Sequence, residues 1–251
     1  MPRIPCLLAA LLMGTLMPSR AQVADSLKEE PAPGNIRMAR YVPTISLGLA
    51  TAVAWRDQGF FSRGEVYRWR QEQHSGFRTH ADNTLQFVPI GVAFLTEALH
   101  GGAPDRYAQS ALHLLKAQAL MAVVVYPVKQ LSHVERPNKR NFQSFPSGHT
   151  AQAFLSATFL HRELRSPQYA DLSGRNWLIA GGYVAAATTG TLRIMNNAHW
   201  LTDVLAGAAI GMLAGNLAYD LRLGKRKQST MVSVMPCWNG GGGLALTAGW
   251  R

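Results

Sequence analysis

Five apolar runs rich in alanine and glycine occupy most of the chain between residues 85 and 219, and one more run precedes them. Their length indicates α-helices, because strands are shorter, and the turns between them contain glycine or proline. The runs therefore predict an all-α fold, a bundle of about five to six apolar helices. Their ranges are Val42–Trp55, Leu85–Leu99, Ala111–Val128, His149–Leu160, Trp177–Leu192 and Trp200–Tyr219.

Glycines recur at four-residue spacing in the last run, at Gly207, Gly211 and Gly215. Residues four apart lie on one face of a helix, so these glycines form a smooth stripe. The stripe predicts a neighbouring helix at close approach, in a membrane or in a soluble helical core.

The two ends of the chain differ from the helical middle. Residues 1–21 resemble a secretory signal, with an apolar segment at Cys6–Met17 and a small-residue cleavage motif that ends at Ala21. An uncleaved anchor is the alternative, but the segment is short for a membrane span. We expect a flexible leader at 22–41, a helical domain at 42–228 and a tail at 229–251 that could form a β-hairpin. The tail gives no indication of function.

The chain is strongly basic, with a formal net charge of +11 and a pI of about 10.2. This surplus favours an anionic partner: nucleic acid, anionic lipid or phosphate. The sequence has no recognition helix, zinc finger or aromatic-interleaved nucleic-acid motif, so we expect no nucleic-acid partner. Two cysteines, Cys6 and Cys237, predict neither a disulfide framework nor a cysteine metal site. The arginine-rich segment Arg56–Thr84 fits a solvated helix or an amphipathic helix on an anionic membrane face.

A Ser-Gly-His turn stands directly before the third long run. The sequence Ser144–Thr150 should place the backbone N–H groups of Ser147, Gly148 and His149 at a helix N-terminus. Unpaired N–H groups and the positive end of the helix dipole attract an anion there. Taken alone, the turn is better explained as ordinary helix capping by Ser147.

Two further stretches carry charge at the ends of predicted helices. Lys129 and Arg136 follow the second long run, and Arg193 follows the fourth. His199 and Asp203 are four residues apart at the head of the last helix, so they share a face. Each group could merely complement a helix dipole or form a helical ion pair. An up-down bundle, however, brings all these helix ends to one face, where they would surround a phosphoryl group.

These residues resemble the three-part signature of the type 2 phosphatidic-acid phosphatase superfamily. The match consists of Lys129-x6-Arg136-Pro137, Pro146-Ser147-Gly148-His149 and Arg193-x5-His199-x3-Asp203. The superfamily includes membrane lipid phosphatases, soluble bacterial class A acid phosphatases and vanadium haloperoxidases. One position departs from the pattern, because Leu192 stands where the family usually has serine, and we expect reduced or altered phosphate contacts there.

The resemblance implies a role for each residue of the signature. His199 would be the nucleophile that forms a phosphohistidine, Asp203 would orient it, and His149 would protonate the leaving oxygen. Phosphoryl oxygens would be held by the remaining residues, Lys129, Arg136, Ser147, Gly148 and Arg193. No metal and no cofactor would be needed, because lysine and arginine supply the positive charge.

Four functions follow from these observations as alternatives. The first is a membrane lipid phosphatase for lipid A, isoprenyl pyrophosphate, phosphatidylglycerophosphate or phosphatidate. The second is a soluble periplasmic acid phosphatase, which the signal segment and the mean hydropathy of −0.02 favour. A haloperoxidase is disfavoured by chain length, and a non-catalytic lipid-binding protein by the complete His–Asp pair. No obligate protein partner is inferred.

Membrane topology follows from the basic cluster Lys225–Lys227, which predicts a cytoplasmic end for the last helix. The site would then face the periplasm from the inner membrane of a bacterial cell envelope. If residues 1–21 are cleaved, parity requires that Val42–Trp55 does not cross the membrane fully.

Overall fold

The computed structural model describes residues 38–56, 62–221, 231–238 and 242–249. The predicted signal peptide and all but the last residues of the predicted leader lie outside this part of the chain. Two compact units divide the chain, Met1–Asp220 and Leu221–Arg251. The first is all-α, as the sequence predicts.

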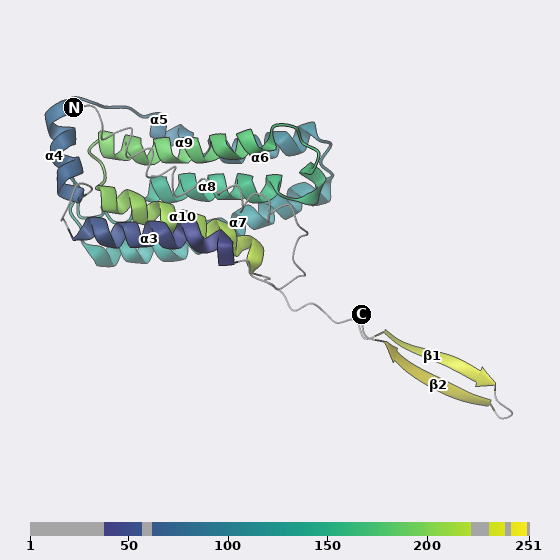
Figure 1. The fold of residues 1–251 in the computed structure, drawn as a ribbon. Helices are drawn as coiled ribbons and strands as arrows, with labels where there is room; N and C mark the ends of the chain where they lie inside the picture. The colour runs from purple at the N-terminus through teal and green to yellow at the C-terminus, as the bar shows by residue number, and fades with distance from the viewer. Residues whose placement is uncertain (1–37, 57–61, 222–230, 239–241, 250–251) are drawn as a thin grey trace. The chain divides into compact units, whose positions relative to one another are not determined.

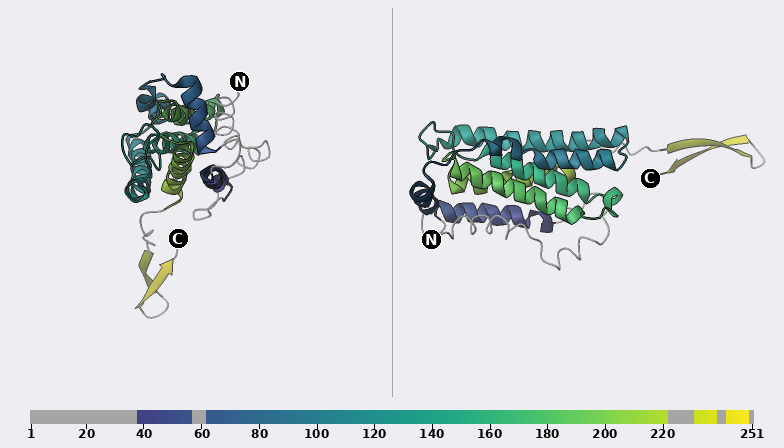
Figure 2. Two further views of the ribbon diagram at one scale, coloured as in Figure 1. Left: turned by 90° about the vertical axis from the view of Figure 1, so that its left-hand side faces the viewer. Right: turned by 90° about the horizontal axis from the view of Figure 1, so that it is seen from above.

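Helix α8 (Gly148–Leu164) is the central element of the first unit, and its side chains from Thr150 to Leu160 are all buried. Long helices surround it and run along a common direction (Figures 1 and 2). They are α3 (Val42–Trp55), α6 (Val88–Leu99), α7 (Pro104–Ser132), α9 (Arg175–Met195) and α10 (Leu201–Asp220). The other elements are α4 (Arg63–His74), α5 (Ala81–Leu85), η1 (Met38–Tyr41) and η2 (Pro167–Tyr169).

The predicted glycine stripe packs α10 directly against the backbone of α8, which confirms its role in close helix approach. A Cβ atom on Gly207 would lie 2.5 Å from the carbonyl oxygen of Ser147. On Gly211 it would lie 2.1 Å from the carbonyl oxygen of Ala151. No side chain larger than hydrogen fits at these positions, so the first turns of α8 and α10 lie side by side.

One predicted helix is divided in the structure. The run Leu85–Leu99 contains the end of α5 and the whole of α6, and the break falls at Gln86 and Phe87. Pro89 lies in the first turn of α6, where its missing N–H costs nothing.

Helix α3 lies along α10, and contacts at its two ends reach the end of α10 and the turn before α8. At its start, the Tyr41 hydroxyl donates to Asp220 at the end of α10, at 2.7 Å. At its end, Trp55 makes an edge-to-face contact with Phe145, in the turn before α8. Helix α3 has 14 residues, fewer than the 20 of α10, and lies beside it.

The arginines of Arg56–Thr84 are not uniformly available to lipid headgroups. Arg70 is buried, and its Nε donates to the carbonyl oxygen of Met195, at 3.0 Å. Arg63 stacks over the ring of Trp200, at 4.5 Å from its centroid. Helix α4 therefore packs on the loop between α9 and α10 instead of lying free on a surface.

Two helices among the described residues, α7 and α10, are long and apolar enough to cross a membrane. Most of α10 is buried inside the bundle, which a soluble core helix would also show. Little of α7 is buried, and several of its large apolar side chains are exposed: Leu112, Leu115, Val123, Tyr126 and Leu131.

The second unit contains two antiparallel strands, β1 (Met231–Trp238) and β2 (Gly242–Gly249). The register pairs Met231 with Gly249 and Trp238 with Gly242.

Candidate active site

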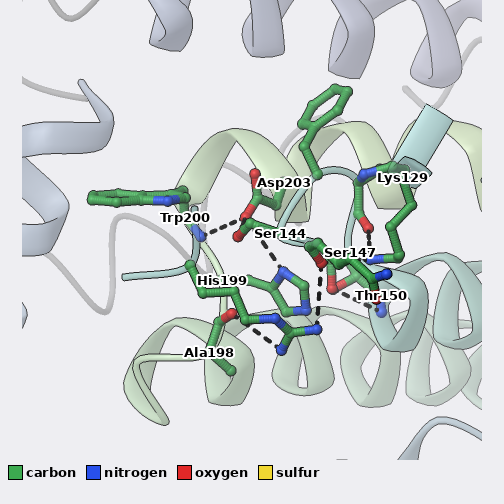
Figure 3. A network of polar contacts seen from close by, with 12 residues as sticks. Lys129, Ser144, Ser147, Thr150, Ala198, His199, Trp200 and Asp203 are labelled. Carbon is green, nitrogen blue, oxygen red and sulfur yellow. Dashed lines mark hydrogen bonds and ion pairs between the residues drawn. The ribbon is translucent and has the colours of Figure 1, made fainter. Parts of the chain in front are cut away.

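Four helix ends meet at one end of the bundle and carry the predicted site residues. Helix α7 ends there with Lys129 in its last turn, and α9 ends there with Arg193. Helices α8 and α10 begin there, so two helix N-termini with positive dipole ends face the same region. Figure 3 shows Lys129, Ser147, His199 and Asp203 converging at this point.

Asp203 holds the imidazole of His199 in one orientation. The distance from His199 Nδ1 to Asp203 Oδ2 is 3.3 Å, and both side chains are buried. The same oxygen accepts from the backbone N–H of Trp200, at 2.8 Å, and from the hydroxyl of Ser144 (Figure 3). Because a carboxylate only accepts, Nδ1 carries the proton and Nε2 keeps a lone pair.

His199 is neutral at ordinary pH. Burial lowers the pKa of its imidazole to about 4, although the hydrogen bond to Asp203 raises it. The charges of Arg136 and Arg193 lower the pKa further. A neutral imidazole with a free Nε2 lone pair is the form that attacks an electrophile.

Ser147 caps α8 and is fully buried. Its hydroxyl oxygen accepts from the N–H of Thr150, and its own N–H donates to the carbonyl oxygen of Asp203, at 3.0 Å. That N–H is therefore occupied, contrary to the expectation that it faces an anion. The N–H groups of Gly148 and His149 have no intrahelical partner, since they lie in the first turn.

The three predicted cations are held in place by neutral or acidic neighbours. Lys129 Nζ donates to the carbonyl oxygen of Pro146, at 2.8 Å. Arg136 Nε donates to the side chain of Asn141, at 2.9 Å. Arg193 Nη1 donates to the buried carboxylate of Asp82, whereas its Nε has no hydrogen-bond partner among the described residues. Arg193 thus retains a donor for an anion.

His149 has a partner that the sequence does not suggest. Its Nε2 lies 2.9 Å from Oδ1 of Asn83, on α5. Burial lowers the pKa of His149 to about 4, the charges of Arg193, Arg136 and Lys129 lower it further, and Asp82 raises it.

Sequence reasoning missed Asp82, Asn83 and Ser144 as members of the site. Ser144 belongs to the stretch Ser144–Thr150, and its position two residues before Pro146 was the signal that could have identified it as a site residue. Asp82 and Asn83 lie more than sixty positions before the residues they contact, so spacing gave no signal.

No group of three or more histidine, cysteine, aspartate or glutamate side chains suitable for a metal ion occurs in the part of the chain that the structure describes. The charge at the site comes from lysine, arginine and helix N-termini instead.

A family model and one relative agree with the resemblance read from the sequence. The PAP2 superfamily model matches residues 126–227, which include every residue from Lys129 to Asp203 of the signature. A lipid A 1-phosphatase from Porphyromonas gingivalis is 33% identical over 175 residues, which are 63% of this chain and 37% of that protein. The chain thus matches well under two thirds of the length of this relative. The crystal structure of Aquifex aeolicus LpxE has a TM-score of 0.43 and 22% identity, over 61% of this chain and 94% of that one.

Proposed function

We propose that this chain, in which residues 126–227 match the PAP2 superfamily model, is a metal-independent phosphatase that removes a phosphate from a membrane lipid. One observation carries the proposal. A neutral, buried His199 is oriented by Asp203 and lies at the meeting point of three cations and two helix N-termini. A nucleophile surrounded by fixed positive charge suits phosphoryl transfer, where positioning and charge stabilisation provide most of the catalysis.

In the first step, His199 Nε2 attacks phosphorus, and a P–N bond forms as the bond to the leaving oxygen breaks. His149 in its protonated form gives its proton to that oxygen, so the alcohol departs neutral. Asp203 stabilises the positive charge that develops on His199. In the second step, water attacks phosphorus, His149 takes a proton from it, and the P–N bond electrons return to Nε2.

The phosphoryl oxygens would lie against Arg193 Nε, Arg136, Lys129 and the N–H groups of Gly148 and His149. We also keep Ser147 in this set, although its hydroxyl is bonded to Thr150 in the structure. Cations that lower the pKa of His149 in the free protein are neutralised by a bound phosphate dianion. Substrate therefore raises the pKa of His149 and supplies the protonated acid that the first step needs.

The exposed apolar surface of α7 supports a membrane location, because large exposed apolar patches mark contact with lipid or protein. The relative named a lipid A 1-phosphatase supports phosphorylated lipid A as the first substrate to test. Isoprenyl pyrophosphate, phosphatidylglycerophosphate and phosphatidate are the other candidates.

We place the site on the periplasmic face of the inner membrane. The support is that α10 runs from the site to Asp220, and the basic cluster Lys225–Lys227 follows in the sequence.

The test is phosphate release from a panel of the four lipids and a soluble phosphomonoester, in detergent micelles. We expect release from at least one lipid, and its loss in His199→Ala. His100→Ala is the matched control, because His100 is exposed at the far end of α6 and should leave the rate unchanged. Equal rates for His199→Ala and the unmodified protein would refute the mechanism. Release of the protein by osmotic shock without detergent would support the soluble periplasmic alternative.

A further inference from the structure

We propose that Asn83 is a positioning residue for His149, which fixes the tautomer and ring orientation of the acid that protonates the leaving oxygen. The proposal rests on the function proposed above and adds a residue outside the signature. Asn83 lies on α5, near the end of the arginine-rich segment Arg56–Thr84, which the sequence indicates only as a solvated or membrane-surface helix.

The contact defines where the proton sits on the neutral ring. Asn83 presents its carbonyl oxygen Oδ1 to His149 Nε2, at 2.9 Å. A carbonyl oxygen can only accept, so Nε2 carries the proton and Nδ1 has the lone pair. Nδ1 is then the nitrogen that gains a proton when substrate binds and passes it to the leaving oxygen.

Each histidine of the site therefore has its own orienting partner, and the two partners differ in charge. His199 is held by the carboxylate of Asp203, which stabilises positive charge on the nucleophile. His149 is held by a neutral amide, which fixes the ring without favouring its charged form. A proton donor held by an amide gives up its proton more readily than one paired with a carboxylate.

Helix α5 is anchored firmly enough to position a side chain. The carboxylate of Asp82 bonds Arg193 Nη1 and, at 3.1 Å, Asn196 Nδ2. Asn196 also donates to the carbonyl oxygen of Thr79 and accepts from its N–H, both at 2.9 Å. These bonds tie α5 to the loop after α9.

Charged groups on three helices and one loop act on His149. Asp82 on α5 raises the pKa of His149, while Arg193 on α9, Arg136 in the loop and Lys129 on α7 lower it. A carboxylate at position 83 would oppose the three cations at close range.

The experiment compares Asn83→Asp, which is nearly isosteric, with Asn83→Leu, which removes the acceptor. Histidine-ring NMR titration of the full chain in detergent micelles, assigned with His149→Ala, follows the protonation directly. We expect Asn83→Asp to raise the pKa of His149 by about one to two pH units, as for an opposite charge within hydrogen-bond distance. In Asn83→Leu, the neutral imidazole of His149 should no longer be held in the Nε2–H tautomer alone.

Kinetics give a second readout, because an activated leaving group needs no proton. With 4-nitrophenyl phosphate, we expect Asn83→Leu to keep its rate within about twofold. With a 1-phosphorylated lipid A we expect a loss of about tenfold or more, since general acid catalysis contributes ~10²- to 10⁴-fold. The kcat of Asn83→Asp should remain high to a higher pH than that of the unmodified protein.

An unchanged pKa of His149 in Asn83→Asp would overturn the proposal, as would an equal loss of rate on both substrates in Asn83→Leu. Failure of the proposed function gives a different result, namely no phosphate release by the unmodified protein while the NMR shift still occurs.

Discussion

Replacing Gly211 with alanine tests whether the α8–α10 contact sets both stability and catalytic geometry. The added methyl group would lie 2.1 Å from the carbonyl oxygen of Ala151 and 2.9 Å from the amide nitrogen of Leu155. Ordinary contact begins at 3.4 Å, so the helices must separate by the difference of 1.3 Å between 3.4 and 2.1 Å.

The magnitude follows from two opposing contributions. Overpacking of a well-packed core costs about 1–3 kcal/mol, and occasionally more. The alanine recovers about 1 kcal/mol of helix propensity. The clash involves backbone atoms on both sides, which cannot rotate away, so we take the upper end of the range. The expected net loss is about 2 kcal/mol, which lowers the unfolding midpoint by about 4–8 °C for a chain of this size.

Gly91→Ala is the matched control, since a methyl group there meets nothing within 4 Å in an exposed position of α6. It should be neutral or more stable by about 0.5–1 kcal/mol. Thermal unfolding of both variants in the same detergent, at one scan rate, measures the difference by tryptophan fluorescence. A midpoint for Gly211→Ala equal to that of Gly91→Ala would refute the close-packing argument.

The same substitution should lower activity. Asp203 lies at the head of α10, and its carbonyl oxygen accepts from Ser147 at the head of α8, at 3.0 Å. Separation of the two helices moves His199 relative to the N-terminus of α8. A displacement of about 1 Å can cost ~10²-fold in rate, so kcat should fall far more for Gly211→Ala than for Gly91→Ala.

Three further predictions concern the site. The value of kcat/KM should fall below about pH 4, because protonation of His199 removes the nucleophile. It should also fall above about pH 6, where a phosphomonoester substrate loses its second proton. A flat profile from pH 4 to 9 contradicts this prediction. Asp82→Asn should lower kcat/KM by about tenfold and reduce the unfolding midpoint, because Arg193 loses a charge-assisted hydrogen bond; unchanged kinetics would show that Asp82 does not hold Arg193 in its working position. Dialysis against EDTA should leave the rate unchanged, whereas loss of activity that zinc or magnesium restores would contradict a mechanism without metal.

The helices themselves were predictable because their signal is local. The predicted run Val42–Trp55 begins and ends at the same residues as α3. The other predicted runs differ from the observed helices mainly at their termini. The four-residue spacing of His199 and Asp203 placed them on one helical face, and the glycines of α10 showed where another backbone approaches. These patterns depend only on the geometry of one helix.

The direction of α3 and the burial of Arg70 were not predictable in the same way. A short apolar run can end inside a bundle or run beside a full-length neighbour, and only the contacts of Tyr41 with Asp220 and of Trp55 with Phe145 decide. An arginine-rich helix can face water or lipid, and Arg70 instead donates to a carbonyl oxygen of α9.

The sequence by itself determined the helices, their polar ends and the identity of the charged groups, because each of these depends only on residue type and spacing. The tertiary structure decided that α5 brings Asp82 to Arg193 and Asn83 to His149, across 111 and 66 positions of sequence. Helical periodicity relates residues only three or four apart. Contacts between distant segments depend on how the helices pack and on where α5 separates from α6, so no spacing in the sequence specifies them.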